Sequence, residues 1–220
     1  GREVFSLALA LQNLLWGIAS PFAGALADKF GAGRVAAIGT LFYAGGLVVM
    51  ASFVSPSGLM MGQLMIGIGL GSAGVSIALG AVARAVAPEK RSLALGMVTS
   101  IGSFGQFAVL PVTQIFIDGY GWQVSLLLLS GLSASMLASC LLMARDEKVR
   151  EVRTADIANI TMNGMLKTAL SSPDYLLLTV GFFVCGIQVV FIATHLPTYL
   201  QDAGIGPEVA SWALGLVGLF

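Results

Sequence analysis

Charged residues are scarce in this chain. Only 10% of its 220 residues are Asp, Glu, Lys or Arg, against about 25% in a typical soluble domain, and 57% are hydrophobic. Most of the molecular surface must therefore face something other than water. The formal net charge is zero, and binding to nucleic acid needs a concentrated basic face, so we expect no nucleic-acid partner.

Cysteine is scarce as well. Cys140 and Cys185 lie inside apolar runs without other ligand-type residues beside them, which favours small buried side chains over a disulfide or a metal site. We expect no metal and no cofactor. The chain also lacks an initiator Met and a signal-peptide pattern, and it ends at Phe220 inside a new apolar run. We therefore expect an internal fragment of a longer protein.

Long apolar runs are what the sequence has in abundance. Each is long enough to cross a hydrocarbon core of about 30 Å as a helix, and the alternating pattern of a barrel strand is absent. The sequence therefore predicts an all-α membrane protein. Six complete spans are expected, and a seventh begins near Val209: Val4–Leu26, Val35–Val54, Leu59–Val82, Leu93–Ile117, Trp122–Met143 and Tyr175–Leu200.

The basic residues gather in every second connector between these runs. The intervening connectors, at residues 55–57, 118–121 and 201–208, carry none, and only Arg2 falls on their side. Basic residues in short loops stay in the cytoplasm, so the protein is expected to be a multi-pass protein of the cell (plasma or inner) membrane with these loops inside. The basic connectors hold Lys29 and Arg34; Arg84, Lys90 and Arg91; and Arg145, Lys148, Arg150, Arg153 and Lys167.

One long polar stretch divides the chain. We expect residues 1–144 to form a helical bundle, 145–173 a central cytoplasmic loop, and 174–220 the start of a second bundle. Within the loop, apolar residues recur at spacings of three to five, which suits either a short amphipathic helix on the membrane surface or a plain linker. These residues are Ile157, Ile160, Met165, Leu166 and Leu170.

The first basic connector carries a recognisable motif. It resembles the loop between helices two and three of major facilitator superfamily transporters, with matches at Gly24, Leu26, Asp28, Lys29 and Gly31. Ala32 and Gly33 stand where that motif has basic residues, and Arg34 follows one position late. The resemblance implies a conformational latch, in which the Asp28 carboxylate meets the positive N-terminus of a neighbouring helix.

This resemblance also numbers the helices. It implies a twelve-helix fold of which the chain holds helices two to seven complete and helix eight truncated. Helix one and the remainder of helices eight to twelve would then belong to the rest of the same polypeptide.

The next basic connector carries a second resemblance, to the helix-five signature of monocarboxylate transporters. Ser100, Ile101 and Gly102 depart from that signature, while residues 181–199 resemble helix seven of bacterial members of the group. The resemblance implies a non-enzymatic secondary transporter that moves a small organic anion with a proton or by exchange for another anion. The matching residues are Lys90, Arg91, Leu93, Ala94, Gly96 and Gly105.

Polar residues inside the spans are the candidates for contact with the substrate, because polar groups are costly in lipid and usually face the interior of the bundle. Each Gln or Asn could equally fasten two helices by a hydrogen bond. Gln63 is expected nearer the outer surface, which weakens it as a candidate. The better candidates, near the expected midplane, are Gln12, Asn13, Trp16, Gln106 and Gln188.

His195 is the single histidine and the candidate for proton coupling, since histidine changes its charge near neutral pH. A structural histidine that forms hydrogen bonds near the membrane interface is the alternative. No Asp, Glu, Lys or Arg lies in the core of a span, so an ionic partner for an anionic substrate is expected in helix one or the rest of helix eight. Two other functions stay open: a superfamily exporter of drugs or other hydrophobic solutes, and a non-transporting membrane receptor on the same fold.

Overall fold

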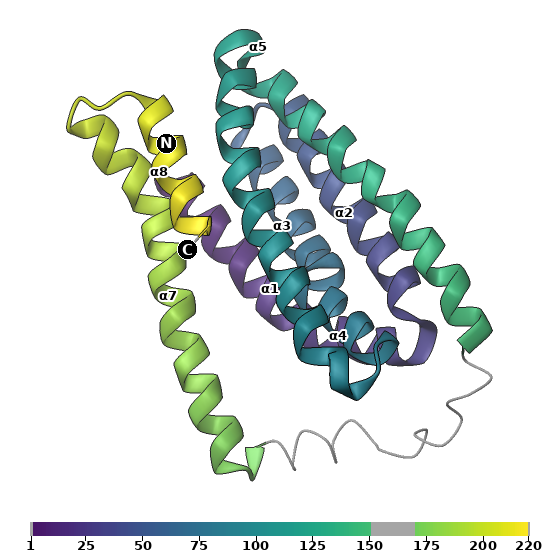
Figure 1. Cartoon of the computed structure of the whole chain (residues 1–220). Coiled ribbons are helices and arrows are strands. Elements are labelled where there is room, and N and C mark those ends of the chain that lie inside the picture. Colours follow the sequence, from purple (N-terminus) through teal and green to yellow (C-terminus); the bar gives the residue numbers. More distant parts are fainter. Residues whose placement is uncertain (1, 151–169, 220) are drawn as a thin grey trace. The chain divides into compact units, whose positions relative to one another are not determined.

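The computed structural model describes residues 2–150 and 170–219, and these are helical throughout apart from short connections (Figure 1). The all-α fold expected from the sequence is confirmed, and the described residues contain no strand. The helices are α1 (Arg2–Phe30), α2 (Ala32–Ser52), α3 (Pro56–Ala73), α4 (Val75–Ala85), the 3-10 turn η1 (Pro88–Lys90), α5 (Arg91–Arg150), α7 (Pro173–Asp202) and α8 (Pro207–Leu219).

The chain forms two compact units. The first contains the described residues of Gly1–Gly102 and Ile115–Val152, and the second those of Ser103–Gln114 and Arg153–Phe220. In the first unit α3 packs against both α1 and α2. A Cβ atom at Gly67 would lie 2.6 Å from the backbone oxygen of Gln12 in α1, and one at Gly69 would lie 2.7 Å from the backbone nitrogen of Tyr43 in α2. Opposite faces of α3 thus bring their backbones close to the two neighbouring helices, as small residues permit in membranes.

The span expected at Leu59–Val82 is not one continuous helix. Gly74 has an extended backbone (φ −75°, ψ −179°), which ends α3 and starts α4. The break lies where a side chain has no room, because a Cβ atom at Gly74 would overlap the backbone oxygen of Leu70. The expected span thus lies within one candidate membrane stretch, Pro56–Ala85, whose helix is broken at Gly74.

The spans expected at Leu93–Ile117 and Trp122–Met143 are joined with little interruption. Helical geometry continues through Asp118 and Tyr120, and only Gly121 departs from it, with φ 80° and ψ 162°. The expected connector at residues 118–121 is therefore confined to one residue. Helix α5 then continues to Arg150, so the first residues of the expected loop at 145–173 are helical. Ile157, Ile160, Met165 and Leu166 lie outside the described residues.

The second unit is built around the α7–α8 hairpin. Gly204 (φ 79°) turns the chain after α7, and the backbone N–H of Ile205 donates to the carbonyl oxygen of Leu200 at 2.8 Å. In the same unit, Phe107 of α5 contacts Trp212 of α8 edge to face, with ring centroids 5.7 Å apart.

Large apolar side chains are exposed over most of the described surface. In α7, all of whose residues are described, none is buried. Among the described residues, five helical stretches are long and apolar enough to cross a membrane, and the longest, Pro88–Arg145, contains the break at Gly121. Exposed apolar surface on this scale is expected of helices that face lipid or neighbouring helices, so the chain is a multi-pass membrane protein.

Candidate functional site

The connector between α1 and α2 is a tight turn built on one glycine. Gly31 has φ 94° and ψ 138°, a conformation that residues with a Cβ atom rarely adopt. Its N–H donates to the carbonyl oxygen of Ala27 at 2.9 Å, and α2 begins at the next residue. The glycine of the sequence motif thus allows a single residue to connect α1 and α2.

Asp28 forms an ion pair across this end of the bundle. Its Oδ1 atom accepts a hydrogen bond from Nη1 of Arg84, near the end of α4, at 2.9 Å. The side chains are 62% (Asp28) and 51% (Arg84) exposed, so water screens the pair and its contribution to folding is small. The sequence suggested a helix N-terminus as the partner of Asp28, whereas the observed partner is a side chain near a helix C-terminus. The sequence did signal Arg84, because it is the first basic residue of the next basic connector.

The other motif residues of this connector make local contacts. Nζ of Lys29 lies 5.3 Å from the centre of the Phe30 ring, and Nη1 of Arg34 donates to the carbonyl oxygen of Phe30 at 3.3 Å. A Cβ atom at Gly24 would meet nothing within 4 Å, so the described chain does not require a glycine there.

The helix-five signature begins just after α4, whose last turn carries Arg84. Lys90 closes η1 by donating its backbone N–H to the carbonyl oxygen of Ala87 at 3.0 Å, and Arg91 opens α5. Both side chains are exposed. Gly96 and Gly105 have open space at the Cβ position, so no close packing explains them within the described residues.

The polar residues expected to form the site in α1 lie beside α3 or bond within their own helix. The backbones of Gln12 and Trp16 line the α1–α3 contact, facing Gly67 and Gly71. Nδ2 of Asn13 donates to the carbonyl oxygen of Leu9 at 2.9 Å. Gln12 and Asn13 are half-buried, while Trp16 is exposed.

The remaining candidates belong to the second unit. A Cβ atom added at Gly218 of α8 would lie 2.5 Å from Cδ of Gln106, so this side chain packs against α8. Gln188 is exposed on α7, and so is His195, whose ring centroid lies 4.6 Å from that of Phe191. Gln188 and His195 therefore share one helix with Phe191, and Gln106 packs against α8.

Gln63 is the polar residue that the sequence undervalued. It is 5% exposed, and its buried Oε1 atom has no hydrogen-bond partner. It lies one helical turn before Gly67, on the face of α3 that approaches α1. That spacing was the available signal: a Gln in register with two closely packed glycines, Gly67 and Gly71, is placed in a helix contact. Its expected position nearer the outer side of the membrane stays a prediction.

Comparison with known proteins identifies the family. The sequence model described as Major Facilitator Superfamily matches residues 1–220. The chain belongs to this superfamily. It is 27% identical over 221 residues to monocarboxylate transporter 13 of Rattus norvegicus, a match that covers 98% of the chain and 48% of the relative. It is 33% identical over 126 residues to a Bacillus subtilis (strain 168) protein named as a niacin/nicotinamide transporter, NiaP, covering 57% of the chain and 30% of the relative.

The chain spans about half the length, or less, of the curated relatives it matches. No solved structure matches it at a significant level.

Proposed function

We propose that the protein is a secondary transporter that moves a small organic anion, of the monocarboxylate class, by alternating access. The observation that carries this proposal is the match to the rat monocarboxylate transporter, which extends over 98% of the chain. Niacin, named in the Bacillus relative, is itself a small monocarboxylic acid. Transport of the anion would be coupled either to a proton moving in the same direction or to exchange for another anion.

The Asp28–Arg84 pair supports a conformational role at the cytoplasmic end of the spans. An exposed ion pair adds little to folding stability, typically about 0.2–1 kcal/mol, but a similar energy is enough to shift the balance between two conformations. The pair joins the end of α1 to the end of α4 in the state described. We propose that it is part of the latch that is made in one state of the transport cycle and opened in the other.

Recognition of the substrate would be divided between neutral and charged groups. The expected contacts within the described chain are the amides of Gln12, Asn13, Gln106 and Gln188, with the indole of Trp16. These groups offer hydrogen bonds but no charge. The cation that balances a bound carboxylate would come from the rest of the polypeptide, because the cores of the spans in this sequence contain no Lys or Arg.

A pair of nearly isosteric probes tests the proposed anion. The full-length protein is reconstituted in liposomes, and uptake of nicotinate is compared with uptake of nicotinamide, which carries a neutral amide in place of the carboxylate. We expect saturable uptake of nicotinate or lactate driven by an inward proton gradient or by internal anion, and little uptake of nicotinamide. Binding without uptake would indicate a receptor instead, and proton-driven export of hydrophobic amines would indicate a drug exporter.

His195 is the proposed proton-coupling residue. It lies on α7 next to the ring of Phe191, with the phenol of Tyr199 one turn further along the helix. We expect His195→Ala in the full-length protein to flatten the pH dependence of uptake, and Phe191→Leu to preserve it, because only the first change removes the imidazole. Unchanged pH dependence in His195→Ala would move proton coupling to another part of the polypeptide.

A further inference from the structure

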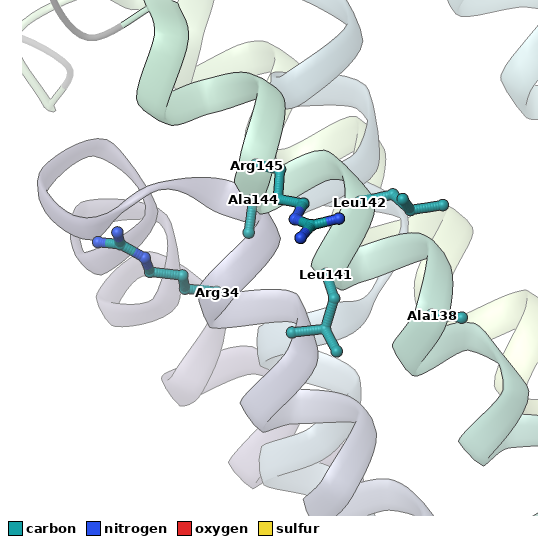
Figure 2. Close-up of a pocket in the computed structure, with 6 residues that line it drawn as sticks. All are labelled: Arg34, Ala138, Leu141, Leu142, Ala144 and Arg145. Carbon is teal, nitrogen blue, oxygen red and sulfur yellow. The ribbon is translucent and has the colours of Figure 1, made fainter.

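Glycines mark several of the places where two helices of this chain come closest, and the atoms opposite each glycine differ. At Gly33 of α2, an added Cβ atom would overlap the backbone nitrogen of Ala144 in α5. The cleft beside this contact is lined in part by Arg34 and Arg145, whose guanidinium groups point away from each other (Figure 2). Gly33 therefore serves the packing of one backbone against another.

Gly218 of α8 lies opposite a side-chain amide instead. A Cβ atom at Gly218 would lie 2.5 Å from Cδ, 2.7 Å from Cγ and 2.8 Å from Nε2 of Gln106. Real Cβ contacts are essentially never shorter than 3.0 Å, so a larger residue at this position must displace its neighbour. Among the glycines of the described residues, Gly218 is the one whose nearest neighbours belong to a side-chain amide.

The backbone beside Gln106 is held against the same helix. A Cβ atom at Gly215 would lie 3.1 Å from the backbone oxygen of Phe107, so α5 and α8 approach closely here. The Phe107 ring also contacts Trp212 edge to face, with ring centroids 5.7 Å apart. These contacts lie within one compact unit of the chain. Because the backbone is held in this way, a methyl group at position 218 is accommodated by movement of the Gln106 side chain.

We propose that Gly218 is a positioning residue, which holds the Gln106 amide in the orientation that meets the substrate. This inference rests on the proposed function, in which Gln106 offers hydrogen bonds to a small organic anion. A Gln side chain is flexible, and holding it in place before the substrate arrives lowers the entropic cost of binding. Gln106 is exposed in the described chain, so the contact with α8 orients this side chain without covering it.

Uptake of nicotinate into liposomes by the full-length protein tests this assignment. We expect Gly218→Ala to raise KM by about three- to tenfold, the size of one hydrogen bond, and to leave the maximum rate within about twofold. Gly186→Ala, within α7 of the same unit, is the control, because a Cβ atom there meets nothing within 4 Å, and its KM should not change. An unchanged KM in Gly218→Ala would overturn the proposal.

A double-mutant cycle shows whether Gly218 acts through Gln106. Gln106→Ala should raise KM, and adding Gly218→Ala to it should raise KM no further, because the displaced amide is already gone. Increases in KM that multiply in the double variant would overturn the proposal.

Folding and transport separate the remaining outcomes. If Gly218→Ala alone fails to fold, the double variant with Gln106→Ala should fold, since the shorter side chain leaves room for the methyl group. Failure of both variants to fold would mean that Gly218 serves helix packing, which overturns the proposal. Failure of the unmodified protein to take up nicotinate or lactate would instead overturn the proposed function, and the substrate role of Gln106 with it.

Discussion

Asp28 and Arg84 are 56 positions apart in the sequence, yet they form an ion pair at one end of the first unit. Asp28 belongs to the family motif and could be singled out from the sequence. Arg84 could not be assigned as its partner, because the pairing depends on α1 and α4 ending at the same level. At the residue scale, the sequence identifies the chemical groups and the packing selects their partners.

We expect Asp28→Asn and Arg84→Gln each to slow substrate uptake while changing stability by less than about 1 kcal/mol, because the pair is exposed to water. Exchanging the two charges, Asp28→Arg with Arg84→Asp, should recover part of the lost uptake. The measurements are uptake into liposomes and thermal unfolding in detergent, on the full-length protein. If the exchange variant is no better than the single variants, the direct pairing is not what matters to transport.

Gly33 shows a different use of a single residue. The backbone of Ala144 leaves no room for a Cβ atom at this position, whereas nothing lies within 4 Å of a Cβ atom at Gly17. We therefore expect Gly33→Ala to lower the free energy of unfolding by about 1–3 kcal/mol, as overpacking does, and Gly17→Ala to cause no such loss. Thermal unfolding of the two variants side by side measures the difference. Equal stability of the two would contradict the close α2–α5 contact.

At the scale of the element, two glycines rather than polar loops mark breaks within the apolar stretches. Gly74 divides the third expected span into α3 and α4, and Gly121 divides the long helix α5. The sequence predicted a polar connector before Trp122 and no break near Gly74, since apolar residues surround Gly74. Hydropathy reports which residues can enter lipid, but it does not report backbone dihedral angles, and that explains both differences.

The conformation of Gly121 (φ 80°, ψ 162°) is nearly exclusive to glycine. We expect Gly121→Ala to destabilise the full-length protein by about 1–3 kcal/mol. Gly119→Ala, two residues earlier in helical backbone with open space around it, is the matched control and should be neutral or stabilising. Thermal unfolding in detergent distinguishes them, and a neutral Gly121→Ala variant would show that the two spans do not need this break.

At the scale of the whole molecule, the basic residues predict orientation. The proposed arrangement puts the connectors with Lys and Arg in the cytoplasm of the cell and the connectors without them outside. In a background with Cys140 and Cys185 replaced by Ser, a single cysteine at Ser57 should react with a membrane-impermeant maleimide on intact cells. A single cysteine at Glu89 should react only after the cells are made permeable. The reverse pattern would overturn the orientation.

The division into halves is the other property of the whole molecule. The expected bundles, residues 1–144 and 174–220, stay a prediction. Within the described residues, Ser103–Gln114 group with α7 and α8 in one compact unit, through contacts such as Phe107 with Trp212. Nothing in the sequence of a segment within an apolar helix indicates which neighbouring helix it will pack against. Long-range packing of this kind could not be predicted from the local pattern.

The sequence by itself determined the class of protein, the approximate position of the apolar spans, and the family motif around Asp28. These properties follow from hydropathy, charge placement and short motifs, which are local. The tertiary structure alone decided that Arg84 pairs with Asp28, that Gln63 is buried, and that Arg34 and Arg145 line one cleft. Each of these depends on which helix faces meet, and that choice is made by the close approach of small residues rather than by any single segment.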